Sequence, residues 1–250
     1  RQALSMAIDV DKIIKYVIYN QGERITGPFP RQTDFYNHHI KPMPYDPEGA
    51  LELLAEAGWQ RNSEGWLEKG GKRLQFKLIT NNGNDIRKAI LAIAQDSWKQ
   101  IGIDVRTDLL EWAVFIQERV NKLDFDALVL GWSMGIDPDL YQIWHSSQTN
   151  DYQLNFVGFD DKEADKLIID IRQEYDQRRE QVVLELERGD PPRSQEAGES
   201  QQHLVLGALD IHLQDHLVVA VTAEQLIVLG ASAQQVWPGA AVDEVDPGTT

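Results

Sequence analysis

Within residues 109–147 the apolar residues change from helical spacing to a continuous run, and this change predicts most of the fold. Side chains at helical spacing predict a first helix with one buried face, which carries Trp112, Phe115, Ile116 and Val120. Residues 125–131 follow as a nearly continuous apolar run. Such a run is typical of a strand covered by helices on both faces, because neither face meets water. We therefore expect a helix, a buried strand, a polar loop and a second helix in this order.

Capping residues mark the starts of three further helices. Asp9 precedes an apolar stripe, Asp46 precedes a proline at the first helical position, and Asn84 precedes a stripe that includes Ile86. Residues 160–175 show the same amphipathic spacing, and we expect them to bury Ala164, Leu167, Ile168 and Ile171.

The strands are predicted from alternating or continuous apolar runs next to glycines. Residues 65–80 read as a hairpin that turns at Gly70 and Gly71, with a second strand from residue 74 to residue 80. From residue 73 to residue 131 the order is strand, helix, strand, helix, strand. This alternation is typical of an α/β fold with a parallel sheet.

A cluster of polar and aromatic residues directly follows the buried strand. The cluster consists of Trp132, Ser133, Asp137 and Asp139. In open α/β sheets, ligands bind at the carboxyl ends of strands, so these four residues are the candidate ligand-binding residues. Two readings of Asp137 stay open: it caps a helix over residues 138–144, or its carboxylate pairs with a ligand ammonium group.

The aromatic residues around this loop also have alternative roles. Trp132 either packs in the core or forms a wall of the binding site, and both readings stay open at this point. Trp144 and His145 are expected to pack and to hydrogen-bond locally.

Several short motifs occur together and in a fixed order. They are RQALSMAIDVDKI at 1–13, GPFP at 27–30, YDPEGALELLAEAGW at 45–59, KQIGIDV at 99–105, EWxxF at 111–115, DFDA at 124–127, GWS at 131–133, DPD at 137–139 and WHSS at 144–147. This series resembles extracellular solute-binding proteins of family 5, which serve oligopeptide and dipeptide ABC transporters. The resemblance covers residues 1–179 and matches the carboxyl-proximal lobe of such a protein.

The resemblance implies an incomplete periplasmic-binding-protein-like type II lobe. It implies a periplasmic or lipid-anchored cell-surface receptor that encloses a peptide or related solute between two lobes and delivers it to an ABC permease. The N-terminal lobe of the same protein would be a further partner. Family members hold the peptide's amino terminus with an aspartate in the loop that contains Asp137, and they carry out no chemistry on the ligand. No enzyme activity and no cofactor are expected.

Composition narrows the remaining classes of function. The chain of 250 residues is 42% hydrophobic and 26% charged, as in ordinary soluble globular proteins, and its net charge of −16 argues against nucleic-acid binding. The absence of cysteine excludes disulfides and thiolate metal sites. No apolar run approaches the roughly 20 residues of a membrane span. Neither a signal peptide nor an initiator methionine is present, so we expect Arg1 to be an internal position of a longer protein.

The last quarter of the chain differs from the rest. Only one of the 21 aromatic residues, Trp237, follows Tyr175. Residues 188–202 have the composition of a disordered linker, and 203–230 are apolar enough to form helix or strand. We therefore expect a lobe over 1–179, a linker over 180–202 and a separate tail over 203–250. Three origins of the tail stay open: a divergent end, a fused piece or a shifted reading frame.

The sequence leaves two other functions open. His212 and His216 have the spacing of zinc ligands on a helix, with Asp215 between them, which would fit a metallohydrolase. The same lobe could also serve as the sensing module of a regulator. The adjacent pair His38 and His39 has no neighbouring carboxylate, so we predict no metal site there.

Overall fold

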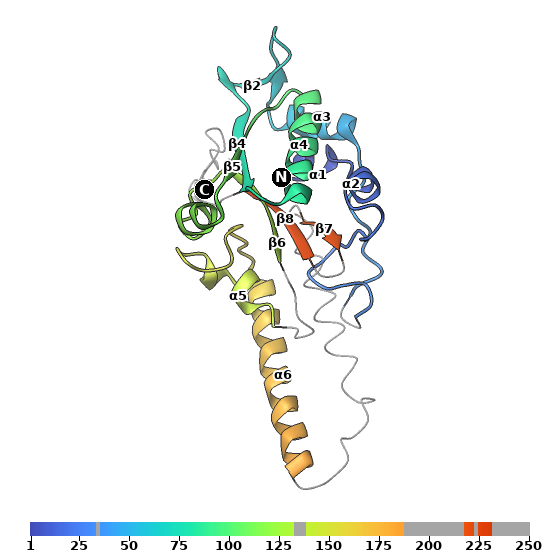
Figure 1. The fold of residues 1–250 in the computed structure, drawn as a ribbon, viewed down its shortest axis with the longest axis vertical. Helices are drawn as coiled ribbons and strands as arrows, with labels where there is room; N and C mark the ends of the chain where they lie inside the picture. Colours follow the sequence, from blue (N-terminus) through green and yellow to red (C-terminus); the bar gives the residue numbers. More distant parts are fainter. Residues whose placement is uncertain (34–35, 133–138, 188–217, 223–224, 232–250) are drawn as a thin grey trace, which may run out of the picture.

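The main feature of the molecule is a five-stranded sheet with helices on both faces (Figure 1). The computed structural model describes residues 1–33, 36–132, 139–187, 218–222 and 225–231. The strand order in the sheet is β5-β4-β6-β8-β7. A separate three-stranded sheet, β1-β2-β3, lies at one end of the molecule (Figure 1).

The first three strands of the large sheet are parallel. β4 (Gln75–Asn81) pairs with both β5 (Asp104–Leu110) and β6 (Ala127–Trp132). The helix α4 (Asp85–Gln100) connects β4 to β5, and the π-helix η1 (Val114–Val120) connects β5 to β6. The predicted alternation of strand and helix is therefore confirmed.

The two faces of the sheet are buried by two different groups of helices. Because successive side chains of a strand point to opposite faces, Leu78 and Val129 pack in one hydrophobic cluster, and Ile79 and Leu128 pack in the other. The first cluster contains residues of four helices: α1 (Gln2–Met6), α2 (Val10–Tyr16), α3 (Pro47–Glu56) and α4. The second contains residues of η1, α5 (Tyr141–Trp144) and α6 (Lys162–Glu187). Burial on both sides explains the continuous apolar run of β6.

All three predicted capping residues begin helices. The side-chain oxygens of Asp9, Asp46 and Asn84 accept backbone N–H groups three residues further on, at 3.0, 2.9 and 2.9 Å. Each bond satisfies a donor that the first turn of a helix leaves without a partner.

The predicted hairpin over residues 65–80 is only partly correct. β1 (Gln60–Arg61), β2 (Leu67–Lys69) and β3 (Lys72–Arg73) form the antiparallel small sheet, and the turn lies at Gly70 and Gly71, which have positive φ. The chain then leaves this sheet at Leu74. The backbone of Leu74 donates to the carbonyl of Leu67 (2.7 Å) and accepts from the N–H of Asp104 (3.0 Å). The predicted second strand, residues 74–80, therefore corresponds to β4 of the large sheet, while the strand that pairs with β2 in the hairpin is the short β3.

The predicted helix in the region of residue 112 begins later than expected. Leu109 and Leu110 belong to β5, because Leu110 still pairs with Asn81 of β4. The carboxylate of Glu111 then accepts the N–H groups of residues 113 and 114, which begins the following turn. Phe115 and Val120 are buried as predicted, but Trp112 precedes η1 and is 49% exposed, so its assignment to the buried face was wrong.

The boundary predicted between lobe and tail does not match the structure. α6 continues to Glu187, past the expected helix end at 175 and into the expected linker. β7 (Val218–Thr222) and β8 (Gln225–Ala231) form an antiparallel pair, and β8 pairs with β6. These two strands therefore extend the large sheet. The physical reason is that β8 satisfies the backbone N–H and C=O groups along the second edge of β6, which burial would otherwise leave without partners.

Candidate functional site

The carboxyl ends of the three parallel strands meet at one edge of the sheet. Asn81 of β4 lies opposite Leu110 of β5, and the N–H of Asn82 donates to the Leu110 carbonyl at 2.6 Å. β6 runs in the same direction and ends at Trp132. We refer to this region as the carboxyl edge. It is where an α/β sheet exposes loop groups that can bind a ligand.

Trp132, one of the four predicted site residues, is the last residue of β6. It is half-buried, and its ring stacks on Phe156 with a centroid distance of 5.6 Å and an interplanar angle of 17°. Phe156 is buried and also meets Phe125 edge to face at 6.2 Å. The position of the Trp132 ring is therefore fixed by packing, while part of its surface stays accessible.

Asn155 holds the segment that carries Phe156. Its buried side-chain amide donates to the carbonyls of Trp144 (3.4 Å), His145 (3.1 Å) and Phe159 (2.8 Å), and its oxygen accepts the Phe159 N–H at 2.9 Å. One side chain thus replaces the regular backbone pairing that this irregular segment lacks. Sequence analysis missed Asn155, because an asparagine in an irregular segment is usually read as a turn residue.

Asp139 is bonded within the protein. Its carboxylate accepts the N–H of Tyr141 at 3.0 Å and lies 3.4 Å from Nε of Arg172, whose guanidinium stacks on the Tyr141 ring at 4.8 Å. The helix α5 starts at Tyr141, so the predicted helix over residues 138–144 was too long at its start. These contacts give Asp139 a structural role, and its role in ligand binding stays a prediction.

Several predicted residues lie outside the part of the chain that the structure describes. Ser133 and Asp137 belong to the loop between Trp132 and Asp139, and His212, Asp215 and His216 precede β7. The two readings of Asp137, and the zinc-ligand reading of the histidines, therefore stay predictions.

Arg87 is the residue of the carboxyl edge that sequence analysis missed. It lies in the first turn of α4 and is only 8% exposed. Its Nη1 donates to Oδ1 of Asn81 at 2.8 Å, and its guanidinium lies 5.8 Å from the centroid of the Trp112 ring. Its Nε is buried and has no hydrogen-bond partner among the described residues. A buried donor without a partner is costly, which points to an acceptor supplied from outside.

Arg87 is also unusual because it is a charged side chain in a buried position. Burial lowers the pKa of Arg87, but an arginine still stays charged at neutral pH. Arg87 also stands three residues after the Asn84 cap, where a capping box has Glu or Gln and where the helix dipole favours a negative charge. This misfit is the signal in the sequence that could have identified it.

Several large apolar side chains are exposed on or next to the elements that meet at the carboxyl edge. Ile86, Leu109, Trp112 and Val114 are all more than a third exposed. Ile86 was predicted to lie on the buried side of its helix, but Arg87 occupies that side instead. A buried cation beside exposed apolar surface suits a ligand that carries both an anionic group and hydrophobic side chains.

A second polar cluster lies where α5 meets α6, and we refer to it as the helix junction. Asp165 of α6 is buried and accepts both the N–H (2.7 Å) and the hydroxyl (2.5 Å) of Ser146 at the start of the 3-10 helix η2 (Ser146–Gln148). Burial by itself raises the pKa of Asp165. The two bonds from Ser146 and the nearby charge of Lys162 outweigh this effect and hold the pKa below its ordinary value of 3.8.

The residue types at the helix junction could suggest a nucleophilic triad, but the bonding does not. The hydroxyl of Ser146 donates to Asp165 directly, and Nδ1 of His145 accepts the N–H of Ser147 at 3.1 Å. Nε2 of His145 is buried without a partner among the described residues. A serine nucleophile needs the histidine as its base, and here the histidine bonds elsewhere. Local packing and bonding of Trp144 and His145 are as predicted.

The described residues also bear on metal binding and on membrane insertion. Within that part of the chain, no group of three His, Cys, Asp or Glu residues could hold a metal ion. His38 and His39 are exposed, and His38 meets the Tyr36 ring edge to face. No helix among the described residues has the length and apolar character to cross a membrane.

Comparisons with known proteins identify the family. Residues 1–153 match the family model described as "Bacterial extracellular solute-binding proteins, family 5 Middle". The chain is 37% identical over 206 residues to the oligopeptide-binding protein AppA of Bacillus subtilis, which covers 76% of this chain and 37% of that protein. It is 31% identical over 180 residues to di/tripeptide-binding protein 1 of Pseudomonas aeruginosa, which covers 71% of this chain and 32% of that protein.

Other relatives have different names. The heme-binding protein A of Haemophilus influenzae is 33% identical over 171 residues, which cover 67% of this chain and 29% of that protein. The chain therefore spans about a third of the length of the curated relatives that it matches.

Solved structures show the same fold. AppA of Bacillus subtilis in complex with a nonapeptide superposes with a TM-score of 0.71 at 31% identity, over 91% of this chain and 42% of AppA. NikZ of Campylobacter jejuni, in complex with Ni(L-His), gives a TM-score of 0.69 at 22% identity, over 92% of this chain and 42% of NikZ, and shows the fold alone.

The periplasmic-binding-protein-like α/β architecture expected from the sequence is thus confirmed. The family model and the relatives together show that this chain belongs to family 5 of the bacterial extracellular solute-binding proteins.

Proposed function

We propose that this chain forms a solute-binding lobe of the substrate-binding component of an ABC transporter. In this proposal the lobe binds peptides or related solutes at the carboxyl edge. One observation carries the proposal: Arg87 is buried at this edge beside the exposed ring of Trp112, and its Nε donor has no partner in the part of the chain that the structure describes. A ligand carboxylate is the acceptor that completes a guanidinium most strongly, because both partners are charged and the bonds can be bidentate.

The other predicted residues have complementary roles in this proposal. Trp132 forms an apolar wall, since its ring is fixed on Phe156 and remains partly exposed. Asp137 pairs with the ligand ammonium group, and Ser133 supplies a hydroxyl. Asp139 supports the loop through Tyr141 and Arg172. A guanidinium, a carboxylate and apolar side chains together match the groups of a short peptide that has free termini.

For the whole protein we propose closure of two lobes around the solute, with delivery to an ABC permease. The chain covers only 42% of AppA, so the second half of the binding site would come from a further lobe. Relatives named for oligopeptides and for di- or tripeptides support peptides as the solute class, and the relative named for heme supports a wider range. The family name supports an extracellular location. We propose that the ligand is released unchanged.

Titration by two-dimensional NMR tests this proposal with the chain as it stands. A single lobe leaves its ligand exposed to water, so we expect weak binding of the tripeptide Ala-Phe-Ala, in the millimolar range or about −4 kcal/mol. The amide and indole signals that shift should belong to Arg87, Trp112 and Trp132. Micromolar binding by this lobe alone, or shifts confined to the helix junction, would contradict the proposal.

The proposed role of Asp137 has its own test. In the two-lobed protein, Asp137→Asn should weaken binding of free Ala-Phe-Ala and leave the N-acetylated peptide unaffected, because only the free peptide carries the ammonium group. Calorimetry on both peptides measures this difference. Equal losses for the two peptides would show that Asp137 has no direct contact with the ammonium group of the ligand.

A further inference from the structure

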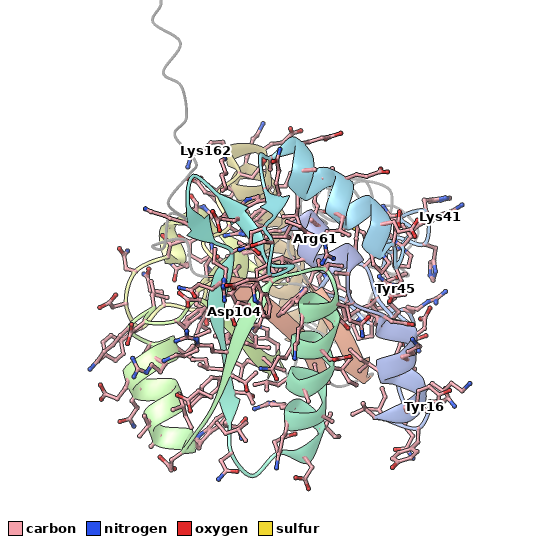
Figure 2. All side chains as sticks on the ribbon, turned by 90° about the horizontal axis from the view of Figure 1, so that it is seen from above. Tyr16, Lys41, Tyr45, Arg61, Asp104 and Lys162 are labelled. Carbon is pink, nitrogen blue, oxygen red and sulfur yellow. The ribbon has the colours of Figure 1, made fainter. Side chains whose placement is uncertain are left out.

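The turn between β4 and α4 contains the only asparagine–glycine pair of the sequence, Asn82 and Gly83. The turn belongs to the carboxyl edge, because it directly follows the last residue of β4. Figure 2 shows it on the outside of the molecule, at the opposite end of β4 and β5 from Asp104. Both residues of the pair are exposed, so water and hydroxide reach the side-chain amide of Asn82.

The conformation of the pair brings the Gly83 nitrogen close to the Asn82 side chain. The Gly83 N–H donates to Oδ1 of Asn82 at 2.9 Å, and Oδ1 is bonded directly to Cγ. Within the described residues this N–H has no backbone acceptor that would hold it away from Cγ. Gly83 has a φ of 83°, and a Cβ added there would meet no atom within 4 Å. The turn therefore has both the backbone freedom and the space to bend.

The neighbouring asparagines are held by the fold, in contrast to Asn82. Oδ1 of Asn81 accepts Nη1 of Arg87 at 2.8 Å, and Oδ1 of Asn84 caps α4. The side chain of Asn82 contacts only the Gly83 N–H among the described residues, so no contact retains its Nδ2. Asn82 is thus the asparagine of this turn whose amide group can leave without breaking a bond of the fold.

We propose that Asn82 is a site of spontaneous deamidation whose product places a carboxylate beside Arg87. The Gly83 nitrogen loses its proton to hydroxide and forms a bond to Cγ of Asn82. The bond from Cγ to Nδ2 breaks, and Nδ2 takes up a proton from water and leaves as ammonia. Water then adds to one carbonyl of the resulting succinimide ring and opens it to aspartate or isoaspartate. The net reaction consumes one water and releases one ammonia.

The existing hydrogen bonds place the new charge close to the guanidinium. In isoaspartate the chain continues through Cγ, and the former backbone carbonyl of Asn82 becomes the free carboxylate. Nδ2 of Asn81 donates to this carbonyl oxygen at 2.9 Å, and the same side chain bonds Arg87. One amide group therefore separates the new carboxylate from the guanidinium. In aspartate the charge lies on the side chain of the same turn.

The consequence for ligand binding rests on the proposed function. A carboxylate in the turn attracts the guanidinium of Arg87 and repels the carboxylate of an arriving peptide. The affinity of the carboxyl edge should therefore fall as the chain deamidates. A negative charge before the first turn of α4 is favourable to the helix dipole, so the fold should persist while binding declines.

Peptide mapping by mass spectrometry tests the modification on the folded chain, incubated at mildly alkaline pH. Asn82 should convert to the acid at a rate within about tenfold of that in a synthetic peptide of residues 80–85, since exposed turns open at little cost. The internal control is Asn150, which is exposed but is followed by Asp151. Conversion of Asn82 no faster than that of Asn150 would overturn the proposal.

Two-dimensional NMR then follows Arg87 in the same samples without any ligand. The Nε–H signal of Arg87 should shift as the unmodified chain deamidates, and Asn82→Asp should show a shift at once. Asn82→Gln is the matched control, because its longer side chain closes a ring far more slowly, and its signal should stay constant. A constant signal in the fully deamidated chain would overturn the placement of the charge beside Arg87.

Titration with Ala-Phe-Ala measures the effect on the site. The deamidated chain and Asn82→Asp should bind this peptide about fivefold more weakly than the fresh chain, and high salt should reduce the difference. The carboxy-amide of the peptide should show no such difference. Equal affinity of the fresh and deamidated chains for Ala-Phe-Ala would overturn the effect on binding. Absence of binding by both would instead contradict the proposed function, while the mass and NMR results decide the modification independently.

Discussion

The carboxyl edge and the helix junction both contain buried charged or polar side chains, but they use them differently. At the junction, Asp165 accepts two bonds from Ser146, and Asn155 makes four contacts with backbone groups. At the carboxyl edge, Arg87 has one bond to Asn81 and a buried Nε without a partner among the described residues.

This difference separates groups that stabilise the fold from groups that are available to a ligand. A polar group that is fully bonded contributes to stability, and its removal leaves its partners buried without bonds. A charged group that is incompletely bonded costs stability, and such groups are typical of functional sites. Mutations at the two regions should therefore have opposite profiles: loss of stability at the junction and loss of binding at the edge.

The largest effect on stability is expected from Asn155→Ala. The substitution leaves several buried backbone groups without partners, so the free energy of unfolding should fall by about 3 kcal/mol. Urea denaturation measures it. Asn150→Ala removes an exposed asparagine from the same segment and should change stability by less than about 0.5 kcal/mol. Equal effects of the two substitutions would remove the structural role assigned to Asn155.

Asp165→Asn should lower the stability less than Asn155→Ala does, and by an amount that depends on pH. The pKa of Asp165 is lowered in the folded protein, so its contribution is present at pH values above its ordinary 3.8 and is lost as the pH falls further. The variant should be less stable by about 2 kcal/mol at neutral pH, and the difference should shrink below about pH 4.

The matched control for Asp165 is Asp170→Asn, at an exposed aspartate of the same helix. Its stability should follow that of the unmodified chain at every pH. A constant difference between Asp165→Asn and the unmodified chain from neutral to acid pH would mean that the charge of Asp165 is not what stabilises the junction.

Arg87→Met should leave the stability nearly unchanged, within about 1 kcal/mol, because an apolar side chain of similar length replaces an incompletely bonded buried charge. The same variant should bind Ala-Phe-Ala about tenfold more weakly. Urea denaturation and NMR titration measure the two quantities. A loss of stability as large as that of Asn155→Ala would assign Arg87 to the fold and weaken the distinction between the two regions.

The smallest change in stability is expected from Trp112→Ala, because its ring is 49% exposed. We expect less than about 0.5 kcal/mol in urea denaturation. In the NMR titration, the signals near Arg87 should shift less on addition of Ala-Phe-Ala, since the apolar part of the proposed site is missing. Unchanged shifts would exclude Trp112 from the site.

The elements that could be predicted from the sequence are those with local physical causes. The caps at Asp9, Asp46 and Asn84 depend on bonds over three residues, and the buried run of β6 depends on its own composition. Trp112 was misassigned because the prediction assumed α-helical spacing up to Val120, whereas η1 is a π-helix, whose wider turn changes which side chains share a face.

The other features of the fold and of the candidate site depend on contacts between residues that are distant in the sequence. Ser146 and Asp165 are separated by 19 residues, and no pattern in the sequence indicates that they meet. The pairing of β8 with β6 joins residues about a hundred positions apart, and the change of composition before it suggested a separate tail. Arg87 was missed because a single arginine in a helix is normally exposed.

The most direct test of the central claim is whether Arg87 and the ligand carboxylate interact with each other. Ala-Phe-Ala and its carboxy-amide are titrated into the unmodified chain and into Arg87→Met, which gives four dissociation constants and one coupling energy. If the guanidinium binds the carboxylate, amidation should weaken binding to the unmodified chain several-fold and should have no effect on the variant. If amidation weakens binding to both proteins by the same factor, Arg87 does not bind the carboxylate and the proposed site is contradicted.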